Sequence, residues 1–192
     1  MKTIQLVVVA AIATALLSCG APKAKKEKAA PSADTHAEFF KTFKQLEGKT
    51  FIGKEVFAAE GVSSWADKEL VMHVRECNDT IVYIPFRVGK NTSRTWMIMM
   101  EEGKKLRLRH DHRHADGTPE DLTMYGGYAT DKGTANQQFF PADDFTSTML
   151  ERIGDNEWSI TFSEDLSTYS YALSKAGELK IQVDFDLTKP VE

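Results

Sequence analysis

Cysteine is scarce in this chain: only Cys19 and Cys77 occur among its 192 residues. The chain also has no glycine-rich phosphate loop and no internal repeat. It has no apolar run of the ~20 residues that a membrane-spanning helix needs. Nucleotide-binding loops and repeat architectures are therefore not expected.

The N-terminal segment has the pattern of a secretory signal. A short basic start, Met1-Lys2-Thr3, precedes an apolar stretch of 14 residues, Ile4–Leu17, which fits a signal peptide. The sequence Leu16-Leu17-Ser18-Cys19 then resembles the lipobox of bacterial lipoproteins, with a small residue just before the cysteine. The resemblance implies cleavage after Ser18 and acylation of Cys19 by diacylglycerol and a fatty acyl chain such as palmitate. Two or three acyl chains would anchor the protein stably to a membrane.

The anchor divides the chain into three parts. Residues 1–18 are predicted to be the signal peptide, residues 19–34 a lipid-anchored disordered tether rich in Lys, Ala and Pro, and residues 35–192 a single β-barrel domain. Because Cys19 would be acylated, no disulfide could form within the chain, and Cys77 is expected to be a small core residue. The resemblance implies a protein of the cell envelope. Since Gly20 rather than Asp follows the cysteine, the outer membrane facing the periplasm is the expected location.

The predicted domain is acidic. The chain has 24 Lys+Arg and 28 Asp+Glu. Removing Lys2, four tether lysines, Glu27 and Asp34 leaves 19 positive and 26 negative residues, a net charge of −7. Nucleic-acid affinity comes mainly from neutralising phosphates. A nucleic-acid partner is therefore not expected, and the membrane contact is assigned to the anchor.

The body of the chain reads as short strands joined by turns. Apolar residues occupy every second position in Trp158–Phe162, Tyr169–Leu173 and Leu179–Leu187, which is typical of half-buried antiparallel strands. Turn residues such as Asn78-Asp79 and Asp116-Gly117 separate the segments. The earlier predicted strands are 51–57, 69–77, 80–88, 94–100, 106–114, 123–130 and 137–140.

Two helices are expected beside these strands. Phe39, Phe40, Phe43 and Leu46 fall on one face of an N-terminal amphipathic helix. A short helix near residues 143–153 is predicted because Phe145, Met149 and Ile153 recur every four residues.

Eight to ten short strands with almost no crossover helices imply an antiparallel meander barrel or a sandwich. The opening helix, the strand entry Leu46–Phe51 and the following meander resemble the calycin (lipocalin-like) barrels in architecture. The expected fold is therefore a mainly β, calycin-like barrel. Such a barrel is filled by side chains or holds one small ligand, and Trp65, Trp96, Met97, Met99 and Met100 are candidates to fill the core or to line a cavity.

The segment most suited to chemistry is a histidine-rich predicted strand. On a strand, one face would carry Leu106, Leu108, His110, His112 and His114. The opposite face would carry Arg107, Arg109, Asp111 and Arg113. If the leucines point into the barrel, the histidines continue their line toward one mouth.

Three interpretations of this segment remain open. The histidines could form a structural hydrogen-bond network with Asp111, Asp116, Glu120 or Tyr125. They could form a ligand or anion site, for which the candidates are His110, His112, His114, Arg109, Asp116 and Tyr125. They could also hold a divalent metal through His110, His112 and His114, with His73 or Asp116 as other candidate ligands; an open fourth position would make that site catalytic.

Several motifs resemble a family of small secreted bacterial proteins with no assigned activity. They are Arg109–His114 with Asp116-Gly117, Met124–Gly127, Phe140–Asp143, and Phe185–Thr188 with Pro190-Val191. The resemblance covers nearly the whole body and implies a single domain, but it transfers no residue roles. Gly126 and Gly127 would let a backbone approach a ligand closely, or bend a barrel corner.

Three functions are therefore carried forward. The favoured one is a lipid-anchored envelope protein that binds a small molecule or acts as an accessory protein, without cofactor or catalytic activity. It predicts a cavity lined by Trp, Tyr and Met. A metal-binding protein or metal-dependent enzyme would instead bring three histidine nitrogens to one point. A structural or partner-binding protein would have a filled barrel and an exposed apolar patch.

Overall fold

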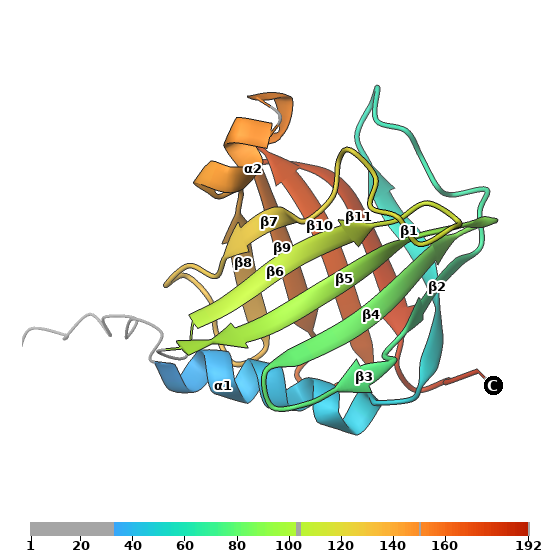
Figure 1. Ribbon diagram of the computed structural model, residues 1–192. Helices are drawn as coiled ribbons and strands as arrows, with labels where there is room; N and C mark the ends of the chain where they lie inside the picture. Colours follow the sequence, from blue (N-terminus) through green and yellow to red (C-terminus); the bar gives the residue numbers. More distant parts are fainter. Residues whose placement is uncertain (1–32, 103–104, 150, 192) are drawn as a thin grey trace, which may run out of the picture.

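The computed structural model describes residues 33–102, 105–149 and 151–191, which form a mainly β, nearly closed antiparallel barrel (Figure 1). Its strands are β1 (Thr50–Ala58), β2 (Leu70–His73), β3 (Glu76–Cys77), β4 (Ile81–Val88), β5 (Asn91–Glu101), β6 (Lys105–His112), β7 (Tyr125–Tyr128), β8 (Gln137–Pro141), β9 (Asn156–Phe162), β10 (Thr168–Lys175) and β11 (Glu178–Asp186). Its helical segments are α1 (Ala33–Thr42), η1 (Phe43–Leu46), α2 (Asp144–Met149) and η3 (Glu151–Ile153). The predicted signal peptide, Cys19 and most of the tether lie outside the described residues.

The strands follow one another as a meander around the barrel. Their order is β7-β6-β5-β4-β2-β1-β11-β10-β9-β8, and β3 pairs with β4 beside this path. The two end strands then approach each other, with hydrogen bonds from Asp143 N to Gly126 O (3.0 Å) and from Thr130 N to Phe139 O (2.9 Å). The barrel prediction is confirmed at this level.

Two glycines make that closure sterically feasible. A Cβ atom at Gly127 would lie 1.8 Å from the carbonyl oxygen of Pro141, at the start of the segment that leads to α2. A Cβ atom at Gly126 would lie 2.1 Å from Leu108 O, and the φ of Gly126 is +148°. The Thr146 hydroxyl donates to Gly126 O and accepts from Gly126 N. These glycines therefore allow close contact between backbones at and beside the seam of the barrel.

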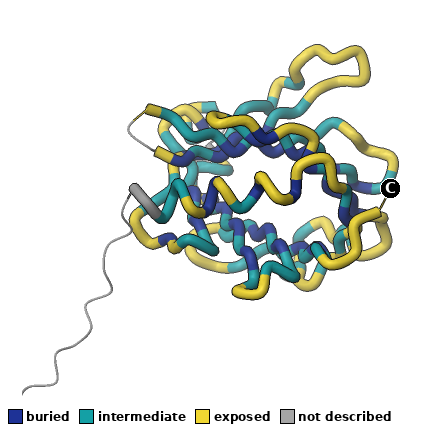
Figure 2. The backbone as a smooth tube through the Cα atoms, turned by 90° about the horizontal axis from the view of Figure 1, so that it is seen from below, coloured by how far each residue is buried: buried dark blue, intermediate teal, exposed yellow. Residues whose placement is uncertain are grey.

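One end of the barrel is filled by the N-terminal helical segments. α1 and η1 lie across this end (Figure 2). Their side chains Phe39, Phe40, Phe43 and Leu46 are all at most 7% exposed. The Phe43 ring meets Phe162 at 5.1 Å and Tyr169 at 6.2 Å between centroids. This half of the barrel is therefore a packed aromatic core.

The inward and outward faces of β6 match the predicted parity. Leu106, Leu108 and His110 are buried, and the register pairs Trp96 with His110 and Arg94 with His112. The prediction is wrong in its length, because β6 ends at His112. The chain turns after that residue, with Gly117 N bonded to His114 O at 3.0 Å. His114 is consequently exposed.

The outer face near the seam is covered by α2. Arg109 is only 3% exposed there, because its guanidinium pairs with Asp143 and lies 5.4 Å from the Phe145 ring. Asp143 also accepts from the backbone N of Thr146 at 3.0 Å, which fixes the start of α2. Helical structure is present where the four-residue spacing predicted it, as α2 and η3, and Phe145 of α2 is 51% exposed.

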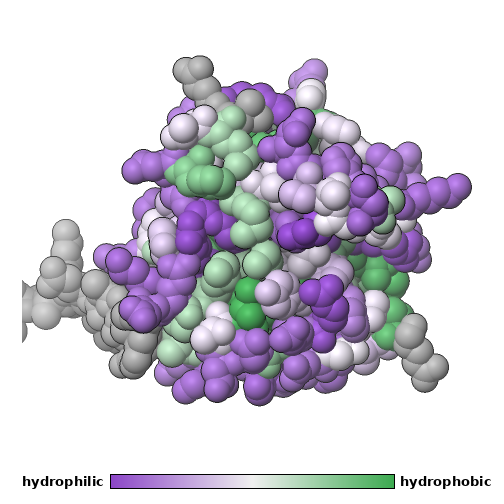
Figure 3. Space-filling model, in the orientation of Figure 1, coloured by the Kyte–Doolittle hydropathy of each residue, from purple (hydrophilic) through white to green (hydrophobic). Residues whose placement is uncertain are grey.

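The rest of the outer surface is largely hydrophilic on the face shown in Figure 3, with hydrophobic side chains gathered near α2. Elsewhere, exposed large hydrophobic residues concentrate on β1, where Ile52, Val56 and Phe57 are between 42% and 49% exposed. Cys77 is buried, as expected for a core residue.

Candidate functional site

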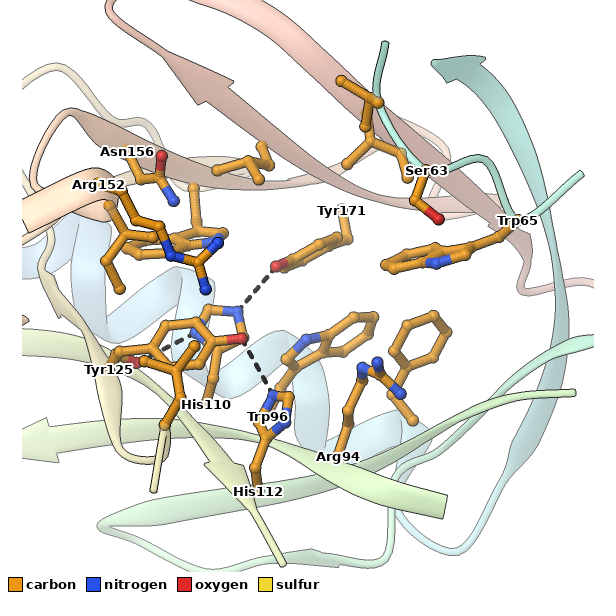
Figure 4. Close-up of a pocket in the computed structure, with 17 residues that line it drawn as sticks. Ser63, Trp65, Arg94, Trp96, His110, His112, Tyr125, Arg152, Asn156 and Tyr171 are labelled. Carbon is orange, nitrogen blue, oxygen red and sulfur yellow. Dashed lines mark hydrogen bonds between the residues drawn. The ribbon is translucent and has the colours of Figure 1, made fainter. Parts of the chain in front are cut away.

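The end of the barrel opposite α1 contains a cavity of about 430 Å³ (Figure 4). It lies beneath the β1–β2 loop, the β6–β7 loop and η3. Its aromatic lining consists of Trp65, Phe86, Trp96, Tyr125, Trp158 and Tyr171. Its polar lining consists of Ser63, Arg94, His110, His112, Arg152 and Asn156. The barrel is thus filled at one end and hollow at the other.

Trp96 forms the floor of the cavity. Its ring stacks against Phe86 on one side and Tyr171 on the other, each at 4.4 Å between centroids and 19° between planes. Trp65, from the β1–β2 loop, packs against Phe86 at 5.6 Å. Offset-stacked aromatic rings are favourable and rigid, so this wall is preorganised.

His110 is fully enclosed at the base of the polar side. Its Nδ1 lies 3.2 Å from the Tyr125 carbonyl oxygen and its Nε2 lies 2.8 Å from the Tyr171 hydroxyl. Burial lowers the pKa of His110 to about 3, so the ring is neutral at pH 7. A carbonyl only accepts, so a neutral ring must carry its proton on Nδ1. Nε2 then accepts from the Tyr171 hydroxyl.

His112 extends the polar network toward the mouth. The Tyr125 hydroxyl lies 3.0 Å from His112 Nε2, and Glu120 lies 3.5 Å from Nδ1. Burial and then the nearby Arg94 charge lower the pKa of His112, while burial raises the pKa of Tyr125 to about 12. At neutral pH the Tyr125 hydroxyl therefore donates to a neutral His112. These polar groups satisfy one another, as the structural-network interpretation expected for Glu120 and Tyr125.

Two guanidinium groups also line the cavity. Arg94 projects inward from β5, two positions before Trp96 on the same face, and Arg152 reaches in from η3 (Figure 4). Nη1 of Arg94 is buried and has no hydrogen-bond partner among the described residues. The cavity therefore has an electropositive polar side and an apolar aromatic side.

The sequence-predicted site residues are only partly brought together. His110, His112 and Tyr125 line the cavity. Arg109 instead lies outside the barrel wall against Asp143. Asp116 is fully exposed and bonds to Thr118, and His114 is exposed in the same loop. The loop departs from the strand after His112, which separates these two residues from the cavity.

The three histidines do not converge. Among residues 33–102, 105–149 and 151–191, no group of three or more His, Cys, Asp or Glu side chains is placed to hold a metal ion. His73 lies on β2, where its Nδ1 is 3.0 Å from the Thr50 hydroxyl. His110 and His112 are occupied by Tyr171, Tyr125 and Glu120 instead.

The sequence singled out Trp65 and Trp96 for the core or a cavity, and both line the cavity. Met97, Met99 and Met100 are not among the lining residues, and Met100 packs against the core instead. The expected methionine lining of the cavity is therefore not found. Sequence patterns did not single out Arg94, Arg152, Trp158 and Tyr171 as site residues. A signal for Arg94 existed, because it shares strand parity with Trp96 and Ile98 and is thus a charged residue at an inward position.

No family model matches the chain, and no curated protein or solved structure shows significant similarity to it. Within the part of the chain that the structure describes, no helix is long and apolar enough to cross a membrane.

Proposed function

We propose that this protein is a lipid-anchored, calycin-like barrel of the bacterial cell envelope that binds a small organic molecule in its open end. The observation that carries the proposal is the cavity of about 430 Å³ at one end of an otherwise packed barrel. Ligand sites are typically concave and mostly apolar, with a few converging polar groups and a volume of about 300–1,000 Å³. The cavity meets each of these criteria.

The shape of the barrel supports a binding role. The stacked Phe86, Trp96 and Tyr171 rings give a rigid apolar wall, and the His110–Tyr171 bond fixes the floor. A preformed wall lowers the ordering cost that a ligand must overcome. Binding therefore needs no rearrangement of the barrel core.

The anchor completes the proposal. Acylation of Cys19, inferred from the lipobox resemblance, would hold the protein at the outer membrane on the periplasmic side. α1 crosses the end opposite the cavity, so a tether that leads into α1 would leave the domain at its filled end. The attachment point and the ligand mouth are thus at opposite ends of the domain.

Native mass spectrometry of the protein, purified without a polyhistidine tag, tests this function. Ser63 stands at the mouth, so Ser63→Trp is expected to block the cavity. Glu60→Trp, an exposed position in the same loop that does not line the cavity, is the matched control. We expect a non-covalent organic mass on the wild type and on Glu60→Trp, and none on Ser63→Trp. An organic mass retained by all three proteins would contradict binding in this cavity.

A further inference from the structure

We propose that the cavity is selective for an organic anion: a small molecule with a planar apolar body and an acid group held by Arg94. This inference rests on the proposed binding function and specifies the class of ligand.

Arg94 is placed at the cavity by the register of three strands. On β5 it pairs with Phe86 of β4 and with His112 of β6, and all three side chains line the cavity. Its guanidinium rises from β5 toward the space below Trp65 (Figure 4). A cation at an inward barrel position loses much of its hydration, and such a loss is costly unless a counter-charge replaces the water.

No carboxylate of the described residues supplies that counter-charge. Three other arginines among the described residues show the usual pairing with acids: Arg87 with Glu69 at 2.8 Å, Arg113 with Asp111 at 2.7 Å, and Arg107 with Glu101 at 2.9 Å. Arg94 has no such pair there, and its buried Nη1 has no hydrogen-bond partner within the same ranges.

The charges of the residues that line the cavity also favour an anionic ligand. Arg94 and Arg152 line the cavity, whereas no Asp or Glu among the described residues does. The nearby carboxylate of Glu120 faces His112 Nδ1 at 3.5 Å. His110 and His112 are held neutral by burial, and their ring nitrogens are already engaged by Tyr125, Tyr171 and Glu120. The guanidinium groups are therefore the charged groups of the lining that remain for a ligand, and they prefer an acid group.

The aromatic residues of the lining indicate that the body of this ligand is apolar and planar. Trp65, Phe86, Trp96 and Trp158 line the same cavity as Arg94. An inorganic anion would leave this apolar surface uncovered, whereas an aromatic acid covers it and brings its charge to Arg94. A carboxylate that binds a guanidinium group through two parallel N–H···O hydrogen bonds has a favoured geometry.

A matched pair of probes tests the inference by isothermal titration calorimetry of the full-length protein. The probes are 2-naphthoate and 2-naphthamide, which share one ring system and differ in charge. We expect the wild type to bind 2-naphthoate at least about tenfold more tightly than 2-naphthamide, a ratio that corresponds to about 1.4 kcal/mol. Arg94→Gln is expected to weaken 2-naphthoate by about 10- to 100-fold and to change 2-naphthamide by less than about twofold.

Two further variants keep the test decisive. Arg152→Gln, an exposed position on η3, is expected to weaken 2-naphthoate by a few-fold without affecting the fold. Arg75→Gln removes a guanidinium that lies over the outer Tyr83 ring and should leave both affinities unchanged. Equal affinity of the wild type for both probes would overturn the anion site and leave the binding function standing. Binding of neither probe would overturn the function as well.

Discussion

His110 shows how a polar side chain is accommodated in the interior of this barrel. Its ring is 3% exposed and keeps both nitrogens bonded, one to a carbonyl and one to a phenol. Both partners suit the neutral ring, and neither compensates a positive charge. Burial therefore lowers the pKa of His110 from 6.5 to about 3.

This shift predicts how stability depends on pH. In the unfolded chain the pKa of His110 returns to 6.5. Below pH 6.5, His110 is therefore protonated in the unfolded state but stays neutral in the folded state. The contribution of neutral, buried His110 to the free energy of unfolding is therefore fully present above pH 6.5, and it is lost as the pH falls toward 3. Between pH 7 and pH 5 the loss from His110 is about 2 kcal/mol. His112, whose pKa is also lowered, adds to the loss in the same direction.

Urea unfolding at several pH values measures the effect. His110→Gln keeps a hydrogen-bond donor and acceptor but does not titrate. We expect its free energy of unfolding to fall by about 2 kcal/mol less than that of the wild type between pH 7 and pH 5. Equal pH dependence in the two proteins would show that His110 is not the buried neutral group described here.

At the scale of elements, alternation of side chains predicted the strands well and their ends poorly. The final three strands, β9 to β11, lie where the period-two pattern placed them. β6 was expected to continue to His114, but the Gly117–His114 turn ends the pairing with β5 and β7 near His112. Alternation reports which face is buried, whereas strand ends depend on turns and on neighbouring strands.

At the seam between β7 and β8, the addition of a single carbon atom is expected to lower the free energy of unfolding strongly. In Gly127→Ala the added Cβ would overlap Pro141 O, a backbone atom that cannot move without displacing the start of α2. We expect a loss of at least about 3 kcal/mol in the free energy of unfolding, since the strain falls on packed backbone. Thermal and urea unfolding measure it.

Gly177→Ala provides the control for this variant. Gly177 lies in the β10–β11 turn with φ +80°, and a Cβ atom added there would have nothing within 4 Å. Its substitution should cost only the left-handed backbone penalty of about 1–2 kcal/mol. If Gly127→Ala were no more costly than Gly177→Ala, close packing at the seam would not be what closes the barrel.

At the scale of the whole molecule, the two ends of the barrel interior differ. α1 and η1 close one end over an aromatic core (Figure 1). The other end keeps a cavity beneath the β1–β2 loop, the β6–β7 loop and η3. The sequence could predict a barrel and the inward row of β6. It could not predict that Arg94 meets Trp158 and Tyr171, because β5 is far from the paired strands β9 and β10 in the strand order and approaches them only when the barrel closes.

The filled end should carry much of the stability. Phe43 is fully buried among Phe39, Phe162 and Tyr169, so Phe43→Ala is expected to cost about 3–5 kcal/mol in the free energy of unfolding. Gln45→Ala, on the exposed side of η1, should change it by less than about 0.5 kcal/mol. Urea unfolding of both variants checks this, and a neutral Phe43→Ala would mean that the helical segments do not seal the barrel.

The central claim is that the open end holds a small organic ligand, and the tryptophans test it most directly. The chain has three, Trp65, Trp96 and Trp158, and all of them line the cavity. Their indole N–H signals in a two-dimensional ¹H–¹⁵N NMR spectrum can be followed while 2-naphthoate is added. Binding in the cavity predicts that all three signals shift together and saturate. Unchanged indole signals at a concentration that shifts surface amides would contradict it.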